Sequence, residues 1–280
     1  MTSIIQKIGE IVSEIYSLNS NDDLSTQAKR YIELIESRNV MAVGYGHRNF
    51  LEMEVAKVHR ISSNDWGNYL GKRDSFAMKY TPEVVSFSTY PHFLPNIPKA
   101  SLSFPDGVFA LFKSFPKMRD IQKRIDLIVE GEQSKFQYHS ETDRYSVIIA
   151  ETNHNQKIAM LIHELSHVAD HENREHKIVS IYDSELGAHK IEFDIAKLIS
   201  NEFLLADVRE YLACFVRSEF EQIIFEDPSQ AGPILFGKIL AKYFGVTNDK
   251  ESYSYLQDEK LIMKPFSDLS VAVAMTNLLM

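Results

Sequence analysis

Three histidines and three acidic residues lie within Leu161–Glu172, whose sequence is LIHELSHVADHE. His163, Glu164 and His167 form the pattern HExxH, in which the two histidines stand four positions apart. Helical residues at this spacing share one face, so both imidazoles can reach one metal ion. Zinc binds neutral imidazole nitrogens, and a catalytic zinc site keeps one position for water. Glu164, next to the first histidine, is placed to take a proton from that water as a general base.

A third metal ligand is expected from the next segment, SELGAHKIEFDIAKLI, which has the apolar spacing of a second helix. Seventeen residues separate Glu185 from His167, enough for a helix end, a loop and a return. Glu192 follows Glu185 by about two helical turns on the same face, so we expect it to orient a ligand histidine. Both glutamates could instead be solvated on an exposed face.

Three further histidines leave alternatives open. Any of them could replace a glutamate as the third ligand: His171, His176 and His189. His171 continues the face of the HExxH histidines, and we expect it at the helix end or at the rim of a cleft. His189 stands one turn beyond Glu185, close enough to bond substrate or water, and is our candidate for a second catalytic residue beside Glu164.

Hydrophobic periodicity predicts a mostly helical chain with a small β component, an α+β class. Helices are expected at about 3–18, 22–38, 115–130, 156–174, 183–201, 203–226, 230–243 and 265–279. The short mixed runs between 40 and 106 predict strands and loops with a few short helices, and KFQYHSETDRYSVIIAET predicts a β-hairpin with its turn at SETD. We expect one domain over 1–280, with a mixed half at 1–140 and a helical zinc-binding half at 141–280.

Composition narrows the classes of function. The chain has 280 residues, 44% hydrophobic and 25% charged, with a formal net charge of -9. This charge disfavours nucleic acid and anionic membranes as partners. Cys214 is the one cysteine, so an internal disulfide is excluded, as is usual in a reducing compartment. It lies in an apolar run, which indicates a core residue. The amphipathic first helix is unlike a secretion signal, and a cytoplasmic location is expected.

The order of motifs resembles that of a known family. HExxH is followed by ELGAHKIE, then by RSEFE at Arg217–Glu221 and by LAKYFGV. Over roughly residues 145–265 this is similar to the catalytic region of the oligoendopeptidase F and thimet oligopeptidase group of zinc peptidases. The resemblance implies a zincin-like metallopeptidase fold of the gluzincin type, in a shortened form, acting on oligopeptides.

The resemblance implies a role for each residue that matches a family motif. It implies that Zn²⁺ is held by His163, His167 and Glu185, with Glu164 as general base and Glu192 behind the ligands. The spacing to Glu185 is shorter than the family's, so Glu192 stays open as an alternative ligand. Family members bind substrate along an edge strand before the HExxH helix, and RYSVIIAE at 144–151 stands in that place.

The C-terminal region departs from the family pattern. Family members carry a histidine- and tyrosine-rich segment there, which stabilises the oxyanion of the tetrahedral intermediate. The corresponding stretch here keeps Pro265 and Phe266 but lacks the tyrosines. Candidates that could replace them are Tyr182, Tyr253, Tyr255, His189 and His92.

Three functions are compatible with these patterns. The first is a zinc peptidase that hydrolyses short peptides, with Glu164 as the base. The second is a zinc enzyme on a peptidase scaffold that acts on one dedicated substrate, such as a small-molecule amide. The third is a non-catalytic metal-binding protein, although a purely structural zinc site has no use for a base beside its histidines.

Overall fold

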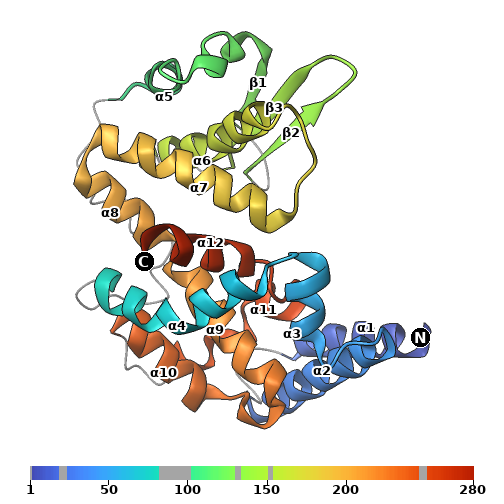
Figure 1. Ribbon diagram of the computed structural model, residues 1–280. Coiled ribbons are helices and arrows are strands. Elements are labelled where there is room, and N and C mark those ends of the chain that lie inside the picture. The colour runs from blue at the N-terminus through green and yellow to red at the C-terminus, as the bar shows by residue number, and fades with distance from the viewer. Residues whose placement is uncertain (1, 19–23, 82–101, 130–133, 151–153, 246–250) are drawn as a thin grey trace. The chain divides into compact units, whose positions relative to one another are not determined.

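Helices dominate the computed structural model, and a small sheet accompanies them (Figure 1), which confirms the predicted mostly-α class. The structure describes residues 2–18, 24–81, 102–129, 134–150, 154–245 and 251–280. No helix in these ranges is long and apolar enough to cross a membrane.

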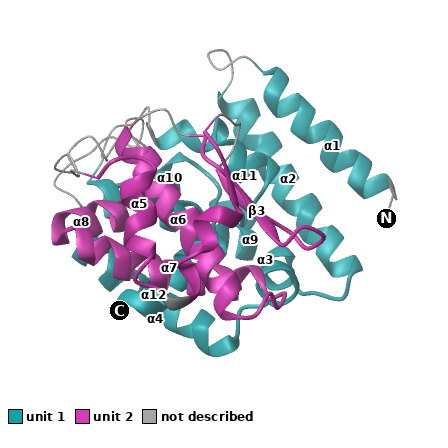
Figure 2. Ribbon diagram, turned by 90° about the horizontal axis from the view of Figure 1, so that it is seen from above, with its two compact units in different colours: residues 1–90, 211–280 teal, residues 91–210 magenta. Residues whose placement is uncertain are grey.

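The chain forms two compact units (Figure 2). Unit 1 combines residues 1–90 with residues 211–280, and unit 2 is the continuous stretch 91–210. The expected single domain, with halves meeting near residue 140, stays a prediction, because compactness alone does not separate folding domains.

Unit 1 is helical throughout the residues that are described. Its elements are α1 (Thr2–Ser17), α2 (Leu24–Gly44), α3 (Phe50–Met53), the π-helical turn η1 (Glu54–Val58), α4 (Ser63–Tyr80), α9 (Leu212–Glu226), η6 (Pro228–Gln230), α10 (Pro233–Phe244), η7 (Glu251–Leu256), α11 (Glu259–Met263) and α12 (Leu269–Leu279). Buried aromatic rings fill its core, including Tyr69, Phe76 and Phe215. Between residues 40 and 81 the structure forms helices and no strand, so the strands predicted there are wrong, whereas the predicted short helices do occur. Residues 82–101 of the predicted stretch lie outside the described residues.

Unit 2 holds the sheet and the predicted HExxH helix. Its elements are α5 (Asp106–Phe112), η4 (Pro116–Met118), η5 (Ile121–Arg124), β1 (Ile125–Ile128), β2 (Lys135–His139), β3 (Arg144–Ile148), α6 (His154–Asn173), α7 (Ile181–Ile199) and α8 (Asn201–Glu210). The helix expected over 203–226 is two helices, since α8 ends at Glu210 and α9 begins at Leu212.

The sheet has the strand order β1-β3-β2. Strands β2 and β3 are antiparallel, with Phe136 opposite Val147, which confirms the predicted hairpin. β1 runs parallel to β3, and only the short 3-10 helices η4 and η5 precede it within this range, so the helix predicted over 115–130 is wrong. The expected edge strand at 144–151 is also wrong: β3 is paired on both sides, and β2 lies at an edge of the described sheet.

The apolar face of α6 anchors the core of unit 2. Ile158, Leu161, Leu165 and Val168 recur at helical spacing and are fully buried, together with Tyr145 and Val147 of β3. Burying a side chain of this size contributes roughly 1.5–3 kcal/mol. This packing fixes the rotation of α6, and the HExxH histidines consequently point away from the core.

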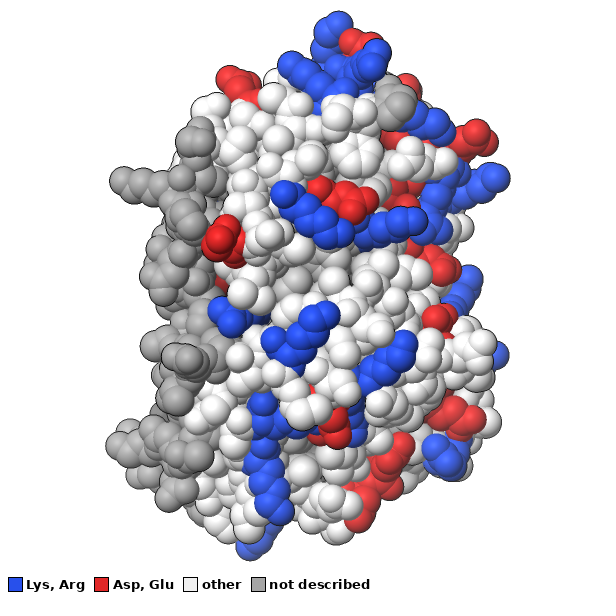
Figure 3. All heavy atoms as spheres, turned by 60° about the vertical axis from the view of Figure 1, so that its left-hand side comes forward, with Lys and Arg blue, Asp and Glu red and all other residues white. Residues whose placement is uncertain are grey.

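Charged groups of both signs lie on the face drawn in Figure 3, separated by uncharged surface. Together with the net charge of -9, this gives no support to a nucleic-acid partner, and the absence of such a partner stays a prediction.

Candidate metal centre

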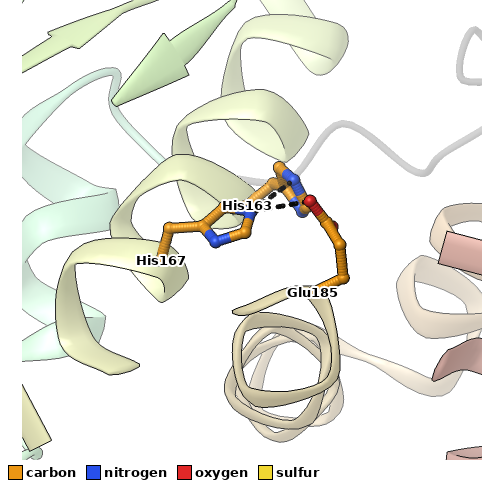
Figure 4. Close-up of side chains that lie close together, drawn as sticks. All are labelled: His163, His167 and Glu185. Atoms are coloured by element: carbon orange, nitrogen blue, oxygen red, sulfur yellow. Dashed lines mark hydrogen bonds and ion pairs between the residues drawn. The ribbon is translucent and has the colours of Figure 1, made fainter. Parts of the chain in front are cut away.

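Two neighbouring helices of unit 2, α6 and α7, carry the candidate site (Figures 1 and 4). Gly187 of α7 lets them approach closely, because a Cβ added there would lie 2.2 Å from Asp170 Oδ1 on α6. This close approach brings the first turns of α7 beside the HExxH segment.

The connection from α6 to α7 is held by capping contacts. Ser180 caps α7 by accepting a hydrogen bond from the Asp183 backbone N–H, at 3.0 Å. Arg174 pairs with Asp170 at 2.7 Å and donates to the Asp183 carbonyl at 2.8 Å. An N-cap of this kind stabilises a helix by about 1 kcal/mol and here sets where α7 begins.

The three predicted ligands meet where the helices face each other (Figure 4). His163 Nε2 lies 3.2 Å from His167 Nε2, and His167 Nε2 lies 3.6 Å from Glu185 Oε1. Tetrahedral zinc, with bonds of about 2.0–2.2 Å, separates its ligand atoms by about 3.3–3.6 Å. The buried Glu185 Oε2 accepts no hydrogen bond from the described residues, and its contact with His189 Nε2 is 3.6 Å long. The donor set and spacing therefore fit a zinc ion.

Both histidines are oriented through their Nδ1 atoms. His163 Nδ1 lies 3.2 Å from Glu192 Oε2, and His167 Nδ1 lies 3.2 Å from Ser184 Oγ. An imidazole that donates from Nδ1 presents the lone pair of Nε2 to a metal. The two Nε2 atoms that face each other are thus the ones left for coordination.

A second group in unit 2 could also hold a metal: His163, His189 and Glu192. In this group His189 and Glu192 are completely buried, and their side chains bond each other directly at 2.6 Å. Such a site leaves no position for water or substrate. Glu185, by contrast, keeps 19% of its side chain exposed, so the group that includes it suits a catalytic metal better.

Charge interactions perturb the buried histidines in opposite directions. Burial alone would lower the pKa of His163, but Glu192 and the neighbouring carboxylates raise it to about 10. Burial, followed by repulsion from His163 and His189, holds the pKa of His167 well below its ordinary value. Burial would raise the pKa of Glu192, but His163 and His189 outweigh it and lower that pKa. The site therefore places anionic carboxylates around the protonated His163. A metal cation could replace the proton on that imidazole.

Glu164 lies beside this cluster. It is 5% exposed, and it accepts a backbone hydrogen bond from Phe136 of β2. Burial is the largest cause that raises its pKa, which reaches about 7 with the nearby Glu185 and Glu192. A carboxylate with this pKa is well matched to accept a proton near neutral pH.

The other candidate histidines lie elsewhere. His171 Nδ1 is 2.9 Å from the Tyr145 hydroxyl, and His176 pairs with Glu172 at 3.4 Å. Neither belongs to the two groups that could hold a metal. His189 lies inside the cluster and is fully buried, with contacts to Glu192 and Glu185.

Four of the five candidate oxyanion donors lie within the described residues, and one of them is the fully buried His189. Tyr182 is 3% exposed, Tyr255 is buried against Tyr31 and Phe220 in unit 1, and Tyr253 is half-buried in the same unit. His92 lies outside the described residues.

Sequence reasoning overlooked three residues around the site. Ser184 forms a hydrogen bond with His167. Its position directly before the candidate ligand Glu185 could have indicated that it lies at the site. Phe136 stacks on His167 with ring centroids 5.2 Å apart, a contact between distant segments that no local pattern reveals. Asp207 of α8 is 2% exposed, and its pKa is raised well above the ordinary value by burial and then by Glu192.

The chain was compared with protein families, curated proteins and solved structures. No family model matches the sequence, and no curated protein matches it. Among solved structures the chain is similar to a PZ peptidase A (TM-score 0.60, 12% identity) and to a putative oligoendopeptidase F (TM-score 0.58, 14% identity). Each similarity covers 89% of this chain and 54% of the other chain. It is also similar to a carboxypeptidase from Deinococcus radiodurans (TM-score 0.59, 11% identity), over 100% of this chain and 66% of the other. The chain thus spans about half to two thirds of the length of these peptidases, and it has their zincin-like fold.

Proposed function

We propose that the protein is a zinc-dependent peptidase that hydrolyses short peptides. The observation that carries the proposal is the meeting of His163, His167 and Glu185 at the separations of a tetrahedral metal site, with Glu164 beside them. The zincin-like fold shared with peptidases supports the choice of substrate class, although fold alone does not fix function.

Each residue has a defined role in this proposal. His163, His167 and Glu185 would hold the zinc, which supplies a Lewis acid that polarises the scissile carbonyl and acidifies a water molecule. Glu164 accepts the proton of the attacking water and later delivers it to the leaving amine. Glu192 and Ser184 keep the two imidazoles in the tautomer that exposes Nε2.

Substrate backbone is expected to lie along β2 rather than β3. β2 has a neighbour on one side only in the described sheet, and the Phe136 backbone reaches Glu164 from that strand. Residues two apart along a strand offer their backbone groups to the same side, so Tyr138 offers its N–H and C=O on the side where the Phe136 N–H meets Glu164. A peptide added there would pass the candidate base.

The test compares wild type with Glu164→Gln in zinc content and in cleavage of a quenched peptide library of graded length. We expect about one equivalent of zinc in both, and a loss of cleavage of about 10²–10⁴-fold in the variant. Lys190→Ala, an exposed change on α7, serves as the matched control. Bound zinc without cleavage of any peptide would favour a dedicated substrate instead, and no zinc in wild type would refute the site.

A further inference from the structure

His189 occupies an unusual position between two carboxylates of the site. Its side chain is completely buried, with Nδ1 2.6 Å from Glu192 Oε2 and Nε2 3.6 Å from Glu185 Oε2. Phe193, one turn further along α7, stacks on the imidazole with centroids 5.8 Å apart. The ring is therefore held in one plane, with one nitrogen toward each glutamate.

The two glutamates have different partners on the metal side. Glu192 Oε2 also bonds His163 Nδ1, whereas Glu185 presents Oε1 to His167 Nε2 and Oε2 to His189. A continuous chain of polar contacts thus runs from Glu185 through His189 and Glu192 to His163. It connects the carboxylate ligand with a histidine ligand through the interior of unit 2.

We propose that His189 is a positioning residue that holds Glu185 and Glu192 at the same time. By facing Glu185 Oε2 at 3.6 Å, it would hold that oxygen away from the metal, so that Glu185 would bind through Oε1 and leave a coordination position open. By engaging Glu192, it fixes the acceptor that orients His163. This inference rests on the proposed function, and it replaces the expectation that His189 touches substrate or water.

Burial supports a positioning role over a catalytic one. With no exposed surface, His189 cannot meet a substrate in this arrangement, whereas His163 keeps 13% of its side chain exposed. Two carboxylates this close repel each other in a medium of low dielectric constant, unless a donor lies between them. The imidazole turns one nitrogen toward each carboxylate and so places a polar group between them, which an aliphatic residue at this position cannot do.

Three substitutions separate the two contacts. His189→Ala removes both; His189→Asn places an amide near the position of Nδ1 and retains the Glu192 contact; and His189→Gln places an amide near Nε2 and retains the Glu185 contact. His154→Ala, an exposed histidine at the start of α6, is the matched control. The measurements are zinc affinity by chelator competition and the visible spectrum of the cobalt(II)-substituted protein, with circular dichroism to verify folding.

We expect His189→Ala to weaken zinc binding by about 10- to 100-fold, as typically follows loss of a residue behind the ligands. Its cobalt spectrum should weaken toward that of a higher coordination number, because Glu185 becomes free to bind through both oxygens. His189→Gln retains the Glu185 contact and should restore the four-coordinate spectrum better than His189→Asn. His189→Asn retains the Glu192 contact and should therefore keep His163 better oriented. His154→Ala should match wild type in both measurements.

The inference is overturned if folded His189→Ala retains wild-type zinc affinity and cobalt spectrum, or if Asn and Gln give identical spectra. In that case wild-type zinc binding and the loss of cleavage in Glu164→Gln would still uphold the proposed peptidase. Conversely, wild type without zinc would refute the proposed function before His189 is tested.

Discussion

Burial and neighbouring carboxylates raise the pKa of the Glu164 side chain. Glu185 and Glu192 are these carboxylates, and the pKa reaches about 7, from an ordinary value of about 4.3. A bound cation would stabilise the carboxylate and bring the pKa part of the way back. The base must be unprotonated to work, so activity is expected to rise with pH through this interval.

We therefore predict an acidic limb in the pH profile of kcat/KM, with an apparent pKa between about 4.5 and 7. Steady-state cleavage from pH 5 to 8 measures it, with zinc content determined at each pH so that loss of metal is not mistaken for protonation of Glu164. A flat profile at constant zinc content would contradict the assignment of Glu164 as the base.

At the scale of elements, the spacing between α6 and α7 determines where Glu185 lies. Gly187→Ala would place a Cβ 2.2 Å from Asp170 Oδ1, whose carboxylate is tied to Arg174. Either Asp170 breaks its ion pair or α7 moves outward, taking Glu185 with it. We predict destabilisation by about 1–3 kcal/mol, measured by urea unfolding, and weaker zinc binding.

The double variant Gly187→Ala with Asp170→Ala tests this cause. Removing the Asp170 carboxylate should recover part of the stability lost in Gly187→Ala, a coupling expected only for residues in contact. Gly71→Ala in α4 is the control, because a Cβ there meets nothing within 4 Å and alanine favours a helix by up to about 1 kcal/mol. Additive effects of the two substitutions would show that the contact does not control the helix spacing.

The helices that carry the site could be predicted because their signals are local. Leu161, Leu165 and Val168 mark a buried face at helical spacing, and the second helix, predicted to begin at about 183, begins at Ile181. β1 could not be predicted, because a four-residue strand depends on a parallel partner, β3, about twenty residues away. The break at Tyr211 has no glycine or proline to signal it.

Prediction of the site shows the same division. The three candidate ligands, which the structure brings together, were predicted from the HExxH spacing and a family resemblance. The contacts that orient it, from Ser184 and from Phe136 of another element, depend on how α6, α7 and β2 pack. Packing between separate elements leaves no periodic trace in a single sequence.

At the scale of the whole molecule, stability should depend on pH through a buried carboxyl in unit 1. Burial raises the pKa of Glu54 to about 7, against an attraction to Arg38 that lowers it. A carboxyl whose pKa is raised in the folded state holds its proton there and loses it in the unfolded chain. Stability consequently falls as pH rises from about 4.5 through 7.

Glu54→Gln should remove this loss. We predict that the variant gains stability relative to wild type between pH 5 and pH 8, on the order of 2 kcal/mol. Urea unfolding at the two pH values measures the change, and Glu36→Gln, at an exposed position of α2, is the control. An equal difference between variant and wild type at both pH values would exclude Glu54 as the source.

The division of the chain into units has a consequence for biosynthesis. Unit 2 is continuous, while unit 1 needs residues 211–280 to complete it. Every candidate zinc ligand, together with Ser184, His189 and Glu192, is therefore synthesised before the second segment of unit 1. This order would allow unit 2 to bind the proposed metal on the nascent chain, before residues 211–280 are complete and can pack with residues 1–90.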